Sequence, residues 1–354
     1  MLLSRAVVEG DPLAAASAGG LSYASDTAPG LRRARHGKGF TYVRADGSAL
    51  RDRATLARIR ALAIPPAWTD VWVALDADAH LQATGRDARG RKQYRYHARW
   101  RGVRDAAKYH RFVEFCGVLP RLRKKVDADL ACPCLCKEKV IATVVALMER
   151  AQLRVGNDEY TRTNGSYGAT TLRDRHASFH GDTLELAYRG KSGIARRVKI
   201  TDRRLATIVR RCRDLPGQRL FQYVDGEQIR PITSNDVNEY LHASTGGPFT
   251  AKDYRTWAAT LGAAALLCHE LRPQSGRESK ACIKRVIATV AAQLGHTPTV
   301  CRASYIHPRL LEDFAGGAIE ALAKTVRRRA KAAAIDVVTL RAIEPVVARY
   351  LDAP

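Results

Sequence analysis

The chain has 354 residues, of which 46% are hydrophobic, so it is long enough for two or three domains with a buried core. Lysine and arginine total 59 against 35 acidic residues, giving a formal net charge of +24 spread along the whole chain, which favours a polyanionic partner. No stretch approaches the roughly 18 apolar residues of a membrane span, and charged residues interrupt the apolar N-terminus, so we expect a cytoplasmic protein without a signal peptide.

The eight cysteines are too sparse for a secreted disulfide scaffold, so a reducing compartment is the simpler interpretation. Three of them, Cys132, Cys134 and Cys136, form a C-x-C-x-C pattern that resembles half of a zinc site. No nearby histidine or second C-x-x-C pair completes four ligands. We therefore expect no metal, and leave metal binding by these thiols as the open alternative.

The first hundred residues predict a disordered tail followed by a small β-rich domain. Residues 1–20 are rich in alanine, glycine and serine and show little periodicity. A short strand is expected over Phe40–Arg44 and a helix over Thr55–Leu62, and the segments VWVAL and LQATG read as two more strands. The predicted domain covers residues 21–100.

The segment GRDARGRKQYRYHARW combines arginines with two tyrosines. Alternate residues of a strand share a face, so Tyr94 and Tyr96 would project together while neighbouring arginines reach phosphates. Arg91 and Gln93 belong to the same segment. The alternative interpretation is a solvated basic edge strand.

Residues 101–107 are the expected hinge, and residues 108–354 are predicted to be mainly helical with a small three-stranded sheet. A helix over Lys137–Leu153 has a broad apolar face and delivers Arg154 at its end. The three strands are expected at His176–His180, Thr183–Tyr188 and Ala195–Ile200.

Two further segments supply basic side chains beside apolar runs. The turn GKSG places Lys191 at a hairpin tip, from which its ammonium can swing into a groove; a solvated turn lysine is the alternative. In the segment AKDYRTW, Lys252 and Arg255 lie one helical turn apart. The alternative interpretation of the arginine is an ordinary surface residue.

The segment LGHTPTVCRASYIHP follows an apolar helical run over Lys280–Leu294. Gly295 stands where a helix C-cap glycine is expected, and Thr297 with Pro298 begins a new helix. Tyr305 would then be held by a short helix rather than a flexible tail, nine residues after His296. Ordinary packing is the alternative for this tyrosine taken alone.

Taken in order, RVGNDEY, GKSG, AKDYRTW and GHTP followed by a tyrosine resemble the catalytic motifs of type IB DNA topoisomerases of the small poxvirus and bacterial branch. GRDARGRKQYRYH and IPPAWTDVW are also similar to that branch, and the resemblance covers about residues 21–308. It implies an α+β fold: a small antiparallel β-sheet domain and a larger, mainly helical catalytic domain with a small three-stranded sheet, forming a clamp around DNA.

The resemblance implies that the protein relaxes supercoiled duplex DNA as a monomer through a 3′-phosphotyrosyl intermediate, strand rotation and religation, without ATP, metal or another cofactor. It also implies a nucleoid-associated location and assigns roles to particular residues. The implied catalytic residues are Arg154, Lys191, Lys252, Arg255, His296 and Tyr305, and the implied DNA contacts are Arg91, Gln93, Tyr94, Tyr96 and Tyr160.

Asn157 and Glu159 stand where the poxvirus enzymes carry lysines used in target recognition, so a strict cleavage sequence is not expected. A tyrosine recombinase is the nearest rival, because it shares an arginine, lysine, histidine and tyrosine chemistry. It usually has histidine at the position of Lys252 and lacks the GRDARGRKQY segment. A non-enzymatic basic DNA-binding protein would explain the charge but not the ordered motifs.

Overall fold

The computed structural model describes residues 12–37 and 39–353, and the chain divides into two compact units, one ending at Arg111 and the other beginning at Phe112. Of the predicted disordered tail, residues 1–11 lie outside the described residues. Pro12–Ala18 forms helix α2 instead, because alanine favours helix and Ala16 is buried in a small cluster with Leu21 and Trp100.

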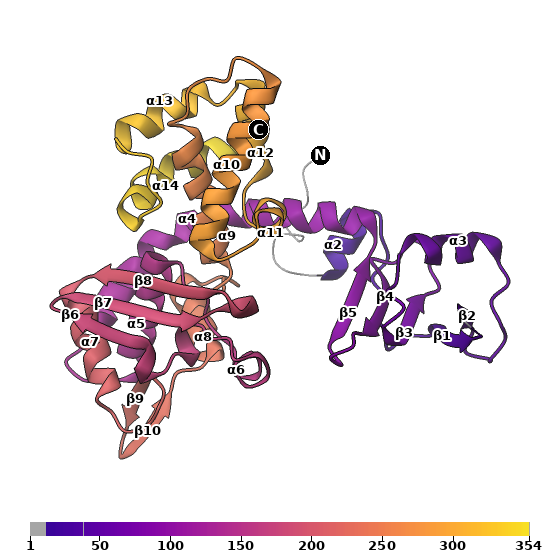
Figure 1. Ribbon diagram of the computed structural model, residues 1–354, viewed down its shortest axis with the longest axis horizontal. Helices are drawn as coiled ribbons and strands as arrows, with labels where there is room; N and C mark the ends of the chain where they lie inside the picture. Colours follow the sequence, from indigo (N-terminus) through magenta and orange to yellow (C-terminus); the bar gives the residue numbers. More distant parts are fainter. Residues whose placement is uncertain (1–11, 38, 354) are drawn as a thin grey trace. The chain divides into compact units, whose positions relative to one another are not determined.

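The smaller unit contains a five-stranded antiparallel sheet with the order β2-β1-β3-β4-β5 (Figure 1). Its strands are β1 (Gly30–His36), β2 (Gly39–Val43), β3 (Thr69–Ala74), β4 (Leu81–Arg86) and β5 (Lys92–Tyr96). Leu31, Val71 and Val73 are buried in one cluster with Ile59 of helix α3 (Arg53–Ala61). The expected antiparallel sheet is therefore confirmed.

Strand β1, with the sequence GLRRARH, was not among the strands predicted from the sequence. Only Leu31 of its seven residues is fully buried, so the alternation of apolar and polar residues that marks a half-buried strand is absent. Helix α4 (Ala98–Leu130) contains the whole segment 101–107 that the sequence suggested as a hinge.

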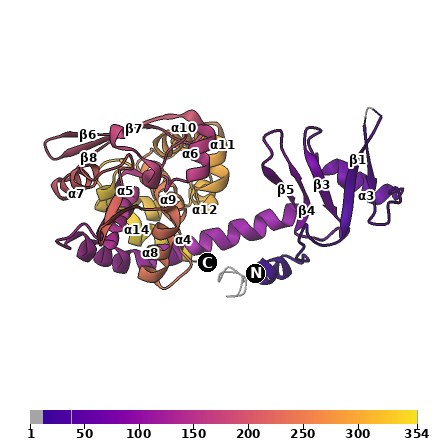
Figure 2. The ribbon, with the colours of Figure 1, turned by 90° about the horizontal axis from the view of Figure 1, so that it is seen from below.

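The larger unit contains the antiparallel sheet β6-β7-β8, formed by β6 (Ala177–His180), β7 (Thr183–Arg189) and β8 (Ala195–Thr201). Helices α5 (Lys137–Ala151) and α7 (Arg203–Arg213) pack against it (Figures 1 and 2). The three-stranded sheet expected from the sequence is confirmed. A second hairpin, β9 (Gln222–Asp225) and β10 (Gln228–Pro231), was not predicted.

Helix α9 (Asp253–Leu267) is almost entirely buried in the centre of the larger unit. The helices that pack against it are α5, α10 (Gly276–Leu294), α12 (Pro308–Gly316) and α14 (Val337–Asp352). The remaining helices of this unit are α6 (Asp158–Asn164), α8 (Ser234–Thr245), α11 (Pro298–Ser304) and α13 (Glu320–Arg329). None of the helices in residues 12–37 and 39–353 is long and apolar enough to cross a membrane.

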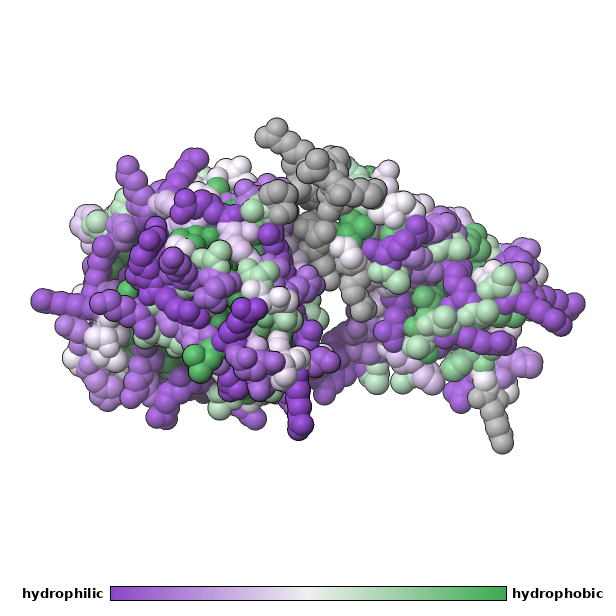
Figure 3. All heavy atoms as spheres, turned by 90° about the horizontal axis from the view of Figure 1, so that it is seen from above, coloured by the Kyte–Doolittle hydropathy of each residue, from purple (hydrophilic) through white to green (hydrophobic). Residues whose placement is uncertain are grey.

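A buried ionic network ties these helices together. Arg123 of α4 contacts Glu149 of α5 and Glu344 of α14, both at 2.7 Å, and the Glu344 carboxylate also accepts a hydrogen bond from the Trp257 indole of α9 at 2.6 Å. Arg341 contacts the opposite oxygen of Glu149 at 2.6 Å. Because each carboxylate has charged partners, helix α5, which precedes Arg154, and helix α9, which carries Arg255, are held in a fixed relation. Outside this core, hydrophilic side chains cover most of the visible face of the larger unit (Figure 3).

Candidate active site

Arg154 is positioned by a turn that follows helix α5. Gln152 adopts a left-handed conformation at the end of the helix, with φ of 54°, and the Arg154 carbonyl accepts a hydrogen bond from the Ala169 amide at 2.8 Å. Gly168 allows this close approach, because a Cβ there would lie 2.5 Å from the Gly156 nitrogen. The segment carrying Arg154 therefore packs directly against a second loop.

Arg255 lies in the first turn of α9 and is only 5% exposed. Its guanidinium donates to the Gln152 carbonyl at 3.1 Å and to the Leu294 carbonyl at 2.5 Å. These two carbonyls stand at the ends of α5 and α10, so one buried cation joins three helices. The Arg255 Nε is buried and has no hydrogen-bond partner among the described residues.

His296 follows the left-handed Gly295, whose φ is 65°, and lies between the two arginines. Its Nε2 is 2.6 Å from Arg255 and 3.2 Å from Arg154. Since a guanidinium only donates hydrogen bonds, Nε2 acts as the acceptor from Arg255. Burial and the positive charges of Arg255 and Arg154 lower the pKa of His296 to about 3, so the imidazole is neutral at pH 7.

Tyr305 caps the C-terminus of helix α11, which begins as predicted with Thr297 and Pro298. The side chain is 9% exposed, and its ring centroid lies 4.4 Å from that of His296 and 5.7 Å from the Arg255 guanidinium carbon. Burial lowers the pKa of Arg154, while attraction to Tyr305 and a hydrogen bond with it oppose that effect. The phenol thus lies among cations.

A pocket opens beside these residues. It is lined by Gln152, Arg154, Tyr167, Tyr188, Gly190, Lys191, Ile194, Arg196, Arg255, Leu294 and Gly295. Lys191 is exposed in the turn η3 (Lys191–Gly193), where the following Ser192 has a φ of 61°. The structure therefore brings Arg154, Arg255, His296 and Tyr305 together and places Lys191 at the rim of the same pocket.

Lys252 is exposed at the N-cap of α9 and is not among the described residues that line this pocket. Tyr160 is 50% exposed on the short helix α6, which Asn157 caps by accepting a hydrogen bond from the Tyr160 amide at 3.0 Å. The Lys252 carbonyl accepts a hydrogen bond from the Arg255 amide at 3.0 Å. In the part of the chain that the structure describes, no side-chain hydrogen bond or ion pair joins Lys252 or Tyr160 to Arg154, Arg255, His296 or Tyr305.

In the smaller unit, Tyr94 and Tyr96 project together from β5, as the alternation predicts. Their rings stack with centroids 5.9 Å apart, and 46% and 40% of the two residues is exposed. Arg91 and Gln93 both contact the Asp87 carboxylate, at 2.7 and 2.9 Å. This surface offers exposed aromatic rings beside basic side chains.

Comparison with known proteins identifies the family to which this chain belongs. Residues 97–333 match the model of the eukaryotic DNA topoisomerase I catalytic core, and residues 39–87 match the bacterial DNA topoisomerase IB N-terminal domain. The chain belongs to the type IB DNA topoisomerases. It is therefore a DNA-binding isomerase that relaxes supercoiled DNA, and the recombinase and non-enzymatic alternatives give way to this assignment.

Individual relatives agree with the family models. The chain is 34% identical over 291 residues to DNA topoisomerase 1B of Acanthamoeba polyphaga mimivirus, covering 80% of this chain and 87% of the relative. It is 21% identical over 240 residues to DNA topoisomerase I of monkeypox virus, covering 67% and 73%. A DNA topoisomerase 1 of Mycosarcoma maydis is 26% identical over 182 residues, 46% of this chain and 18% of the relative.

One basic residue of the pocket was missed in the sequence analysis of this topoisomerase. Arg196 of β8 lines the pocket and donates to the Gln293 carbonyl at 2.8 Å at the end of α10. Its charge contributes to the low pKa of His296. The available signal was its position three residues after the GKSG turn, but ARRVK holds three basic residues and the sequence does not show which of them faces the pocket.

The neutral state of His296 predicts a pH dependence of stability. An unfolded histidine has a pKa of about 6.5, so between about pH 3 and 6.5 the unfolded state binds more protons and the folded topoisomerase loses stability as the pH falls. After discounting for solvent screening, the wild type should lose about 1–2 kcal/mol more than His296→Asn between pH 7 and pH 4. Urea unfolding of both proteins at the two pH values measures this difference. Equal losses would show that His296 is not held neutral by its surroundings.

Proposed function

We propose that Tyr305 is the nucleophile of the topoisomerase and that Arg154, Arg255 and His296 bind the phosphate it attacks. The observation that carries the proposal is the convergence of these three side chains on one nearly buried tyrosine. A phenol surrounded by forked cations suits attack on an anionic phosphodiester better than it suits core packing.

The proposed step forms a bond between the Tyr305 oxygen and phosphorus and breaks the bond from phosphorus to the 5′ oxygen. The five-coordinate transition state carries extra negative charge on its non-bridging oxygens. Two guanidiniums can hold those oxygens through paired hydrogen bonds, and the partnerless Arg255 Nε is a buried donor for which a phosphate oxygen would be an acceptor. A phosphate entering here would also replace His296 as acceptor.

The tyrosine has to lose its proton, which passes to solvent, as it attacks. A free tyrosine has a pKa of about 10, so only about 0.1% is ionised at neutral pH. The guanidiniums of Arg154 and Arg255 lie where they can stabilise the negative charge that develops during the attack. Covalent capture then retains the energy of the broken phosphodiester bond, so religation is the reverse step and needs neither ATP nor a metal ion.

Lys191 is the proposed acid that protonates the departing 5′ oxygen. Its turn lies at the pocket rim, and its charge contributes to the low pKa of His296, so its ammonium acts on the same site. Lys252, which is exposed outside the pocket lining, is the second candidate for this role.

We further propose that residues 21–100 form a DNA-clamp domain and residues 108–354 the catalytic domain, that they close around duplex DNA, and that the enzyme acts as a cytoplasmic, nucleoid-associated monomer. The exposed Tyr94 and Tyr96 with nearby basic residues support the DNA-binding role of the first domain. Tyr160, on an exposed helix six residues beyond Arg154, is proposed as a contact from the second.

The proposed function is tested by plasmid relaxation with purified protein, without ATP and with EDTA. Supercoiled plasmid should be converted to relaxed topoisomers although ATP is absent and EDTA removes divalent ions. Relaxation that requires ATP or a divalent ion would contradict the proposed mechanism, and recombination of two DNA sites without relaxation would favour the recombinase chemistry.

The contacts of the smaller unit predict two different effects on DNA affinity. The logarithm of the binding constant should fall with the logarithm of salt concentration by about 0.9 per phosphate neutralised. Arg91→Ala should flatten this slope by about 1, whereas the double substitution Tyr94→Ala, Tyr96→Ala should weaken binding without changing the slope. Fluorescence anisotropy across a salt series measures both. An unchanged slope for Arg91→Ala would indicate that this arginine stays paired with Asp87.

A further inference from the structure

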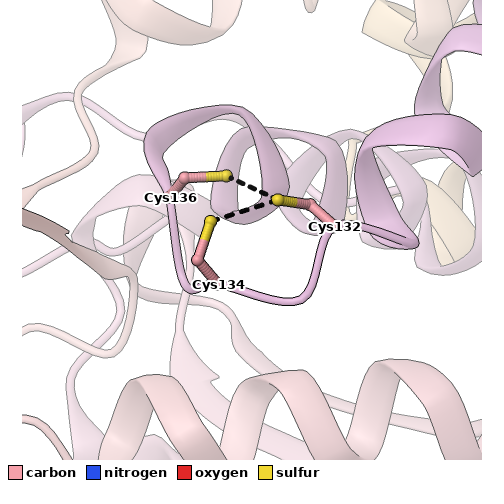
Figure 4. A group of neighbouring side chains, drawn as sticks. All are labelled: Cys132, Cys134 and Cys136. Atoms are coloured by element: carbon pink, nitrogen blue, oxygen red, sulfur yellow. Dashed lines mark hydrogen bonds between the residues drawn. The ribbon is translucent and has the colours of Figure 1, made fainter.

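A cluster of three thiols lies in the connection between helices α4 and α5. The Cys132 sulfur is 3.1 Å from that of Cys134 and 3.4 Å from that of Cys136, and all three lie within 4.8 Å of one another (Figure 4). None of the three forms a disulfide. The cluster has no part in the proposed DNA chemistry.

The loop that carries the thiols is held by hydrogen bonds that other residues donate to its backbone carbonyls. The Val224 amide donates to the Leu135 carbonyl at 3.1 Å, and Arg211 donates to the Pro133 carbonyl at 3.3 Å. Lys139 donates to the Cys132 carbonyl. These hydrogen bonds fix the backbone on both sides of Cys134. The loop conformation that brings the three sulfurs close together is therefore held by neighbouring elements.

The surroundings are also suited to negative charge. Cys136 is the N-cap of the 15-residue helix α5, where unpaired amides and the helix dipole favour an anion. The Lys139 ammonium and the Arg211 guanidinium reach the same loop. Three thiolates around one cation carry a net negative charge, and these groups would offset it.

We propose that Cys132, Cys134 and Cys136 bind one thiophilic d10 metal ion, Zn²⁺ or Cu⁺, through three thiolates. Three S–H protons pass to solvent as three metal–sulfur bonds form. With a zinc–sulfur distance of about 2.3 Å, tetrahedral ligands stand about 3.8 Å apart, so the Cys132 sulfur needs to separate from each of the other two by only several tenths of an ångström. Cys134 is exposed and can make that movement.

The two ions differ in what else they need. Cu⁺ accepts three thiolates as a complete set, whereas Zn²⁺ normally takes a fourth ligand. Among the described residues, no further histidine, cysteine, aspartate or glutamate belongs to the group, so solvent would supply the fourth zinc ligand. In either case the ion would cross-link the end of α4 to the start of α5.

The test is metal retention by the full chain purified under reducing, oxygen-free conditions, loaded separately with Zn²⁺ and with Cu⁺, and desalted. Elemental analysis should find about one ion per chain with at least one of the two metals, and thermal unfolding should shift upward on loading. Co²⁺ used as a probe in place of Zn²⁺ should give a thiolate-to-cobalt absorption band.

The variant Cys134→Ser should lower metal affinity by more than about 100-fold, beyond the 10- to 100-fold typical of losing an outer-shell partner, and should lose the cobalt band. Because Cys134 is exposed, the substitution should leave the fold intact, and circular dichroism checks this. Cys282→Ala, which removes a thiol outside the cluster, should retain the metal. Retention of neither metal, equal retention by Cys134→Ser, or isolation of two of the three thiols as a disulfide would overturn the proposal.

Discussion

Tyr305→Phe is expected to abolish plasmid relaxation and leave non-covalent DNA binding nearly unchanged. The substitution removes one hydroxyl and no positive charge, so the two guanidiniums proposed to bind phosphate keep their hydrogen bonds to His296 and to the Gln152 carbonyl. Relaxation should fall below detection, because without the nucleophile the two-step pathway is lost. Relaxation assays give the first quantity, and anisotropy with a short duplex gives the second.

Tyr223→Phe is the matched control, since this tyrosine lies on β9 outside the pocket lining and should leave relaxation intact. Two other tyrosines, Tyr167 and Tyr188, do line the pocket. A covalent protein–DNA adduct that persists in Tyr305→Phe would transfer the role of nucleophile to one of them.

Lys191→Ala is expected to slow cleavage of an ordinary phosphodiester by about 100- to 10,000-fold, the range typical of lost general acid catalysis. An alkoxide is a poor leaving group and needs a proton as it departs. When sulfur replaces the bridging 5′ oxygen, the departing thiolate is far less basic, so the variant should recover much of the lost rate. Single-turnover cleavage of the two substrates measures the recovery.

Arg255→Lys provides the comparison for this experiment. It should also be severely impaired, because an ammonium cannot replace the fork that contacts the Gln152 and Leu294 carbonyls and His296. Its defect lies in charge stabilisation and positioning, so the sulfur substrate should restore less of its rate. If Lys191→Ala were equally slow on both substrates, Lys191 would be a phosphate-binding or structural residue, and Lys252 or Arg154 would be the next candidate acid.

The sequence predicted the grouping around Tyr305 because local signals fixed the elements that carry it. Gly295 ends α10 in a left-handed conformation and Thr297 caps α11, so the chain direction between His296 and Tyr305 follows from residue types. The ordered motifs placed Arg154 and Arg255 in the same site, and the structure shows the hydrogen bonds between them and His296.

What the sequence could not predict depends on contacts between distant segments. The burial of Arg255 requires the carbonyls of Gln152 and Leu294, which are 103 and 39 residues away. The orientation of Arg196 toward the pocket is set by the register of β8 with β7. The C-x-C-x-C spacing shows that the three cysteines are near one another in sequence. It does not contain the hydrogen bonds that the Arg211 side chain and the Val224 amide donate to carbonyls of their loop.

The proposal that Tyr305 is the nucleophile is tested most directly by mapping the covalent complex. The enzyme is denatured during turnover on a duplex, digested with protease and nuclease, and the nucleotide-bearing peptide is sequenced by mass spectrometry. The account predicts a single modified residue, Tyr305, joined to a 3′-phosphate, with the opposite side of the break bearing a free 5′-hydroxyl. Attachment at Tyr167 or Tyr188, or linkage through a 5′-phosphate, would contradict it.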